Sequence, residues 1–215
     1  MITLLKEYKH LFSQRDFLIS FFASLVFLVV SFIINWYAGV YATANASNPV
    51  TDIVLSNVRT FDVDGIFVFG TIFFWTFMIL LGLKDPKTIP FLFASVALFV
   101  VVRSLFISLT HIGPFPTQIV IDSNIIDKFS FGGDLFFSGH TGLPYLMALV
   151  FWRNTILRAF FILSSISFGI IVLLAHLHYS IDVLSAFFIT YTIYHIAERL
   201  FKGEREIFYG KLKSK

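Results

Sequence analysis

The stretch FLISFFASLVFLVVSFIINWYAGV, residues 17–40, contains no charged side chain. A helix rises 1.5 Å per residue, so this stretch is long enough to cross the roughly 30 Å hydrocarbon core of a bilayer. Trp36, Tyr37 and Tyr41 stand at its far end, where an interfacial aromatic belt is expected. The stretch therefore predicts a first membrane-spanning helix and places the whole chain among membrane proteins.

The composition agrees with that prediction. The 215 residues are 57% hydrophobic and 13% charged, with 29 Phe and a mean hydropathy of +0.84. Soluble domains carry about 25% charged residues, so too little polar surface is available here to coat a soluble globule. The net charge of +3 is too small to indicate nucleic-acid binding, and the absence of Cys excludes disulfides and thiolate metal sites.

Five more apolar segments follow the first, at residues 65–83, 90–109, 135–152, 157–175 and 180–200. They predict an all-α, polytopic membrane protein: a bundle of six transmembrane helices that forms one catalytic domain over residues 17–201. Residues 1–16 have apolar side chains at helical spacing and predict an amphipathic helix on the membrane surface. Residues 202–215 are expected to form a basic cytoplasmic tail.

The distribution of basic residues predicts the orientation. Arg59 and Lys128 are the two on one side, and Arg103 lies within an apolar segment. Thirteen lie in the termini and loops of the other side: Lys6, Lys9, Arg15, Lys84, Lys87, Arg153, Arg158, Arg199, Lys202, Arg205, Lys211, Lys213 and Lys215. The positive-inside rule places both termini in the cytoplasm, which six spans allow.

Two polar stretches interrupt the apolar sequence, GDLFFSGHT at residues 133–141 and HLHYSIDV at residues 176–183. Ionisable groups at the edge of a membrane span are costly, and this favours a functional interpretation. His178 and Asp182 are four positions apart and share a helix face if the last helix begins near His178. A carboxylate that fixes the imidazole tautomer and stabilises its cation suits a nucleophilic histidine.

The first polar stretch supplies groups that suit a phosphate. His140 follows Ser138 and Gly139 at an expected helix start, where backbone N–H groups favour a bound phosphate. A second histidine there can protonate a leaving oxygen, and the planar Arg103 guanidinium can neutralise phosphate charge. In the predicted topology all these groups lie on the extracytoplasmic side.

Two of these residues have other interpretations. Arg103 can form an interhelical pair with Asp62 or Asp64, alone or in addition to binding phosphate. Asp134 suits a helix cap or a loop brace better than a catalytic acid.

Metal binding by His140, His178 and Asp182 is possible on residue type alone, but the spacing of the last two also serves a histidine nucleophile. We expect no metal and no cofactor. The roles of His111 and His176 stay open, as do those of Asp62 and Asp64.

The two polar stretches resemble motifs of the sphingomyelin synthases. Residues 133–141 are similar to Cys-Gly-Asp-x-x-x-Ser-Gly-His-Thr, and residues 173–183 to His-Tyr-Thr/Ser-x-Asp-Val, with similarity continuing through residues 186–190. Arg103, with Thr110, weakly resembles the arginine motif of the third span. That family belongs to the type-2 phosphatidic acid phosphatase superfamily, which has six-span members. The resemblance covers about residues 133–194.

The resemblance implies that His178 is the nucleophile and forms a phosphohistidine, that Asp182 orients it, and that His140 assists the leaving group. We expect substrate contacts from Arg103, Asp134, Ser138, Gly139 and Tyr179.

Some positions depart from the family pattern. Gly132 stands where the family has Cys, and the Pro-Leu-Pro-Asp motif between the first two spans is missing, so only Asp62 or Asp64 could take its place. Val172 stands where the superfamily's phosphatases have an arginine, as in the synthase branch, and their longer lysine-and-arginine signature is absent.

The sequence thus predicts headgroup transfer through a phosphohistidine. A lipid phosphate phosphatase is the alternative, and a non-catalytic lipid carrier or scramblase is a third candidate. The expected substrate is a membrane phospholipid or sphingolipid, with a lipid alcohol or water as acceptor and no nucleic-acid partner. The membrane is a bacterial inner membrane, or a Golgi or plasma membrane in a eukaryote, and the oligomeric state stays open.

Overall fold

The computed structural model describes residues 2–119 and 132–210, and this part of the chain contains helices and no strand. Asp122, Asp127 and Lys128 of one loop, and Lys211, Lys213 and Lys215 of the tail, lie outside the described residues. The elements in order are α1 (Ile2–Phe12), α2 (Arg15–Ala44), α3 (Asp64–Lys84), the short 3-10 helix η1 (Pro86–Thr88), α4 (Ile89–Leu109), α5 (Gly139–Val150), α6 (Thr155–Leu174), α7 (Ser180–Leu200) and α8 (Lys202–Phe208).

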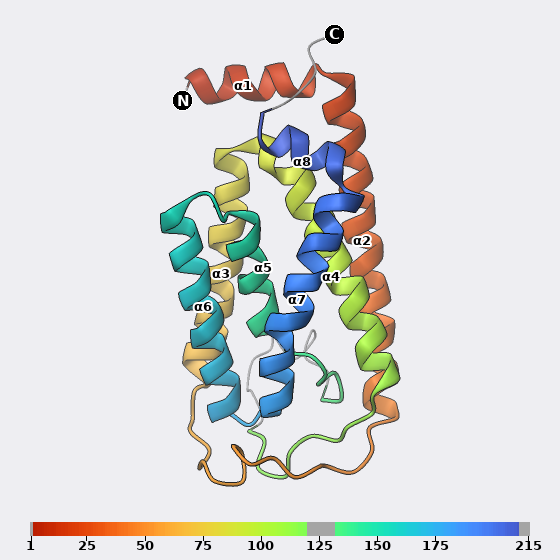
Figure 1. Cartoon of the computed structure of the whole chain (residues 1–215), viewed down its shortest axis with the longest axis vertical. Helices are drawn as coiled ribbons and strands as arrows, with labels where there is room; N and C mark the ends of the chain where they lie inside the picture. Colours follow the sequence, from red (N-terminus) through yellow and green to blue (C-terminus); the bar gives the residue numbers. More distant parts are fainter. Residues whose placement is uncertain (1, 120–131, 211–215) are drawn as a thin grey trace.

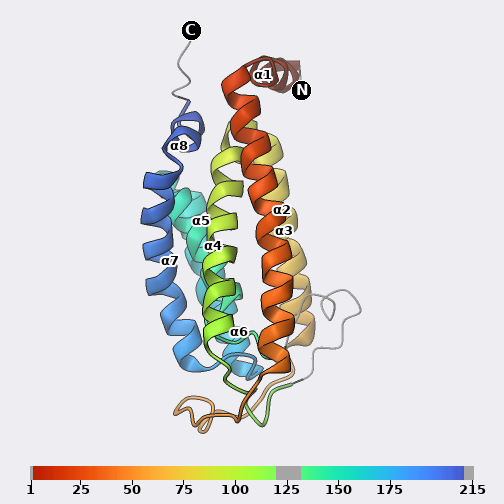
Figure 2. The same ribbon diagram turned by 90° about the vertical axis from the view of Figure 1, so that its right-hand side faces the viewer.

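Helices α2 to α7 lie alongside one another as a bundle (Figure 1). Helix α1 lies across one end, and α8 lies at the same end, where Leu11, Phe17 and Ile207 form a small buried cluster. We call this the α8 end. The loops that precede α3, follow α4 and precede α5 gather at the opposite end, which we call the loop end (Figures 1 and 2).

Five stretches are long and apolar enough to span a membrane: α2, α3, Pro86–Leu109, α6 and α7. The remaining expected span, residues 135–152, forms a helix only over the 12 residues of α5. A helix of that length covers about 18 Å, which is less than the hydrocarbon thickness. Helix α5 begins short of the loop end (Figure 1), because residues 135–138 are not helical and Ser138 caps the first turn.

Helix α4 occupies the centre of the bundle. It packs against α2, α5, α7 and α8, and 50% of its most apolar 18-residue window is buried. In α2 and α3 only 17% of the corresponding window is buried, so their large apolar side chains face outwards, as expected for surfaces in contact with lipid. The largest fully buried apolar side chains include Phe91, Phe137, Phe161, Leu146 and Met147.

The first part of the predicted basic tail forms a helix that packs against the bundle. Helix α8 covers its first seven residues, and Ile207 is buried. The Phe208 ring packs against Phe91 and Phe151, with centroid separations of 5.8 and 5.6 Å. Residues 202–208 therefore belong to the packed bundle, because their apolar side chains cover the end of α4.

Candidate active site at the loop end

His178 and Asp182 meet at the start of α7. Nδ1 of His178 lies 3.4 Å from Oδ2 of Asp182, and the two residues are 7% and 0% exposed. This is ion-pair distance without hydrogen-bond alignment, and among the described residues Nδ1 has no hydrogen-bond partner. With Nδ1 facing the carboxylate, Nε2 is the ring nitrogen left for a substrate.

The helix boundary differs from the one expected. Helix α7 begins at Ser180, so His178 lies outside it, and regular helical spacing does not bring the pair together. The pair meets because Asp182 turns back to cap its own helix: Oδ2 accepts the Tyr179 N–H at 2.9 Å. Such a cap fixes the chain direction on entering the helix and with it the position of His178.

A second carboxylate caps the same helix from a distant loop. Oδ2 of Asp52 accepts the Ser180 N–H at 2.7 Å, and its Oδ1 accepts the N–H groups of Val54 and Leu55 at 2.8 and 3.1 Å. Burial raises the pKa of the Asp52 carboxyl, but the hydrogen bonds from Ser180, Leu55 and Val54 outweigh burial and hold the pKa below its ordinary value.

Sequence reasoning missed Asp52. The residue stands in a polar loop that carries no motif, and nothing in the local pattern links it to the start of α7. The only available signal was an aspartate followed by two apolar residues. This pattern fits an aspartate in a local turn as well as one that caps a distant helix.

A backbone hydrogen bond joins the two polar stretches. The Ser138 N–H donates to the Asp182 carbonyl at 3.1 Å, and the Ser138 hydroxyl oxygen accepts the Thr141 N–H at 3.3 Å. Ser138 is therefore the N-cap of α5, and its backbone fixes α5 relative to α7. The N-terminus of α5 and the N-terminus of α7 thus lie next to each other.

Arg103 holds the segment that leads into α5. Its Nε donates to the Phe137 carbonyl at 2.9 Å, and its Nη2 contacts both the carbonyl and Oδ2 of Asp134, at 2.6 and 3.1 Å. A Cβ on Gly139 would lie 3.2 Å from Nε of Arg103, so the glycine lets the guanidinium approach the first turn of α5.

The ion-pair partner of Arg103 among the described residues is therefore Asp134. Asp62, one of the partners considered from the sequence, instead accepts the Asp64 N–H at 3.3 Å at the start of α3. Asp134 acts as the brace that the sequence favoured. Nη1 of Arg103 has no hydrogen-bond partner within the described residues, so one edge of the guanidinium is still available.

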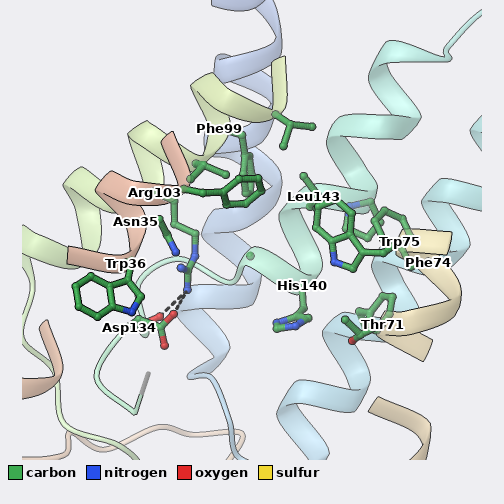
Figure 3. Close-up of a pocket in the computed structure, with 16 residues that line it drawn as sticks. Asn35, Trp36, Thr71, Phe74, Trp75, Phe99, Arg103, Asp134, His140 and Leu143 are labelled. Carbon is green, nitrogen blue, oxygen red and sulfur yellow. Dashed lines mark hydrogen bonds and ion pairs between the residues drawn. The ribbon is translucent and has the colours of Figure 1, made fainter. Parts of the chain in front are cut away.

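A cavity of about 700 Å³ lies beside these groups. Figure 3 shows the Arg103–Asp134 pair on one side of it, His140 between, and Thr71, Phe74 and Trp75 on the other. The lining comes from α2 to α6 and is mostly apolar, and the helices it separates, α2 and α3, are the two most exposed spans. A cavity of this kind, apolar with a few polar groups gathered at one end, suits an amphiphilic ligand.

His140 points its ring into this cavity (Figure 3). The ring packs against Phe67 and Phe168, with centroid separations of 4.5 and 6.2 Å. The hydrogen bond from the Ser138 N–H to the Asp182 carbonyl places the first turn of α5, which carries His140, beside the start of α7. The structure thus gathers His140, His178 and Asp182 at the loop end.

Other polar residues at this end brace the loops. Nε2 of His176 lies 3.1 Å from the Val58 carbonyl, and its Nδ1 lies 2.6 Å from the Thr117 hydroxyl. A carbonyl only accepts, so the neutral tautomer protonated on Nε2 satisfies both contacts. His176 has a φ of 54°, which places this non-glycine residue in the left-handed region.

Tyr179, expected to contact substrate, is directed into the loops. Its hydroxyl donates to the Gly113 carbonyl at 2.8 Å and accepts the Val50 N–H at 3.2 Å. His111 contributes in a similar way: its carbonyl accepts the Ser47 N–H at 2.8 Å. These contacts make the loop around residues 46–58 a support for the start of α7.

The described residues contain no cluster of three or more His, Asp or Glu side chains that could hold a metal ion. The cluster of His178, Asp182 and His140 is instead arranged as two imidazoles and one carboxylate beside helix N-termini and a guanidinium. Chemically, this set can accept and donate protons and can stabilise a phosphoryl group.

Comparison with known protein families gives one match. Residues 132–199, less than half of the chain, match the family described as PAP2 superfamily C-terminal. No curated protein and no solved structure matches the chain. The matched residues include both polar stretches and all of α5, α6 and most of α7. The match supports the type-2 phosphatidic acid phosphatase superfamily and, with the apolar helices, an integral membrane enzyme of the lipid phosphatase or phosphotransferase type.

Proposed function

We propose that this protein is an integral membrane lipid phosphotransferase that moves a phosphorylated headgroup through a phosphohistidine at His178, as the sphingomyelin synthases do. The observation that supports this most directly is the junction of the two matched stretches. His178 lies beside Asp182, and the hydrogen bond from Ser138 to the Asp182 carbonyl joins them to the start of α5, where His140 lines an apolar cavity. The loop end faces the extracytoplasmic side, because the basic residues are concentrated at the other end.

The apolar part of the cavity holds an acyl chain or sphingoid chain of the substrate. The phosphate then lies near Arg103, His140 and the start of α5, where N–H groups and the free edge of the guanidinium meet its charge. Since α2 and α3 are the most exposed of the lining helices, the lipid reaches the cavity sideways from the bilayer.

In the first step Nε2 of His178 attacks phosphorus, and the bond from phosphorus to the alcohol oxygen of the donor lipid breaks. Protonated His140 gives its proton to that oxygen, so a neutral lipid alcohol leaves. Asp182 stabilises the positive charge on the His178 ring.

In the second step a hydroxyl of the acceptor attacks phosphorus and gives its proton to His140, while the bond between phosphorus and His178 breaks. His178 and protonated His140 are restored. The burial of His178 and the aromatic lining limit access of water, and this favours a lipid hydroxyl as acceptor.

The match to the phosphatase superfamily supports a second candidate, hydrolysis of a lipid phosphate with water as acceptor. Both candidates share the first step and the same three residues. They differ only in what accepts the phosphoryl group.

Purified protein in nanodiscs separates the candidates. Labelled phosphatidylcholine with ceramide yields labelled sphingomyelin from a transferase of the proposed kind, and labelled phosphatidic acid yields free phosphate from a phosphatase. The first reaction should proceed and the second should be slow. His178→Ala should abolish product and the acid-labile phosphoprotein, whereas His195→Ala, at the α8 end, should retain both. Turnover by His178→Ala, or no turnover of any phospholipid by the native protein, would exclude the mechanism.

A further inference from the structure

A second, small cavity lies at the α8 end, opposite the candidate active site. Its volume is about 230 Å³. It is lined by Arg153, from the turn between α5 and α6, and by four residues of α8 and the position after it: Lys202, Arg205, Glu206 and Tyr209. None of these residues takes part in the chemistry proposed above.

The docking of α8 creates this cavity. Ile207 is buried against α1 and α2, and Phe208 packs on Phe91 and Phe151, so these two side chains fix the apolar face of the helix. The polar face is then directed towards Arg153. The Tyr209 ring contacts two guanidinium groups: its centroid lies 4.2 Å from Cζ of Arg153 and 5.8 Å from Cζ of Arg205.

The charges in the cavity are mostly positive and only partly paired. Arg205 forms an ion pair with Glu198 at 2.5 Å, yet its buried Nε has no hydrogen-bond partner among the described residues. Within the same part of the chain, neither Arg153 nor Lys202 forms an ion pair. Glu206 is the one carboxylate in the lining. The lining therefore carries three cations and one carboxylate. Arg205 is also paired with Glu198 outside the lining, but its Nε–H is still free in this part of the chain.

We propose that this cavity binds the phosphate of an anionic phospholipid in the leaflet at the α8 end. Arginine side chains bind phosphate oxygens as planar forks, and basic pockets between membrane helices on the cytoplasmic side accommodate anionic headgroups. The small volume suits a headgroup, with the acyl chains remaining in the bilayer.

The position supports a lipid as the source of the phosphate. Trp152, next to Arg153, is 48% exposed, and its ring lies 4.8 Å from Cζ of Arg158. An exposed tryptophan beside arginines at the end of a helix is typical of the headgroup level of a membrane. The cavity lies at the same level, where α7 ends at Leu200 and α8 begins.

Binding can be measured with the full chain in a neutral detergent, titrated with short-chain phosphatidylglycerol, short-chain phosphatidylcholine or inorganic phosphate. Phosphatidylglycerol should bind with an affinity that depends on the residues of this cavity. Phosphatidylcholine, the proposed substrate, should bind at the candidate active site alone, so its affinity should not change in the cavity variants, and inorganic phosphate should not bind. Arg153→Gln and Lys202→Gln should each weaken phosphatidylglycerol binding about fivefold. Lys84→Gln removes a charge at the same end but outside the cavity, and it should leave the affinity unchanged.

Glu206→Gln should tighten binding by a similar factor, about fivefold, because it removes the one repulsive charge from the lining. A misfolded variant cannot produce this gain. Equal losses in Lys84→Gln and Lys202→Gln, or no gain in Glu206→Gln, would overturn the site. Binding of inorganic phosphate without binding of phosphatidylglycerol would show that the cavity takes a free phosphate ion, and it would contradict the proposal of a lipid headgroup. Turnover by His178 is a separate measurement, so either proposal can fail alone.

Discussion

The Asp52 carboxylate and the Ser180 N–H, 128 positions apart in the chain, are joined by a 2.7 Å hydrogen bond. This contact anchors the first turn of α7 to the loop before α3. The proposed nucleophile lies two residues before Ser180, so its position depends on a loop that contributes no group to the chemistry.

Asp52→Asn should lower the free energy of unfolding by about 2 kcal/mol at neutral pH, because an amide weakens hydrogen bonds that a charged acceptor makes to three N–H groups. It should also lower kcat more than it raises KM, since His178 loses its fixed position. Thermal unfolding in detergent and steady-state turnover measure the two effects. Asp62→Asn is the matched control, because Asp62 is exposed and makes one local contact. Equal effects in the two variants would contradict a special role for Asp52.

Acid stability should report on the same carboxylate. Its pKa is lower in the folded protein than the ordinary value of 3.8, so the ionised group stabilises the fold above that value. The contribution is lost as the pH falls below 3.8 towards the folded pKa. A plot of Tm against pH should therefore decline less steeply below pH 3.8 in Asp52→Asn than in the native protein. Parallel curves would show that other carboxyl groups control acid unfolding.

Asp182→Asn should reduce kcat by about a hundredfold or more, because the cation on His178 loses its counter-charge and the ring loses its orientation. KM should change little if the carboxylate does not contact the substrate. Labelling reactions quenched at successive times should show that the phosphoprotein forms more slowly in this variant than in the native protein. A variant that forms it at the native rate would show that Asp182 serves only as a helix cap.

Arg103→Lys keeps the positive charge but removes the planar guanidinium group with its several N–H donors. Lysine cannot reproduce the separate bonds from Nε to Phe137 and from Nη2 to Asp134, so the segment before α5 should loosen. We expect a loss of about 1–3 kcal/mol in stability and at least tenfold in kcat/KM. Thermal unfolding and turnover are the measurements, and Arg59→Lys, in a loop at the same end, is the control. Native behaviour in Arg103→Lys would mean that charge alone is needed.

Two adjacent glycines offer a matched pair. A Cβ on Gly133 would lie 2.7 Å from the Ala42 carbonyl oxygen and from Cα of Thr43, both backbone atoms that cannot move aside cheaply. A Cβ on Gly132 meets nothing within 4 Å among the residues that the structure describes. Gly133→Ala should therefore lower stability by about 1–3 kcal/mol, and Gly132→Ala should be nearly neutral. Thermal unfolding compares them directly, and an inverted order would contradict the packing of α2 against this segment.

Much of the bundle follows from apolar segment lengths. Residues 180–200 were expected as the last span, and α7 covers the same residues, because the preceding polar stretch and Leu200 mark its limits. The segment at residues 135–152 was expected as an interrupted span, and it is helical only over Gly139–Val150. Its first residues are as apolar as the rest, and only the contacts of Arg103 and Ser138 with the backbone reveal that the chain is not helical there.

The candidate site, like the bundle, was predictable where local sequence patterns determine it and not where long-range contacts do. His178, Asp182, Ser138 and His140 lie in short patterns whose spacing carries chemical information. The role of Asp52 depends on a long-range contact, which spacing cannot reveal. The direction of the Tyr179 side chain depends on Gly113 and Val50, which come from other loops.

The shortness of α5 has a consequence for biosynthesis. A twelve-residue helix preceded by a polar motif is a poor signal for independent insertion by the translocation machinery. Helix α6 follows after a short turn and packs along α5, so the two should partition into the bilayer together as a helical hairpin. The polar stretch at residues 133–141 would then reach its final depth only when α6 has left the ribosome, and chains truncated before Thr155 should leave that stretch outside the membrane.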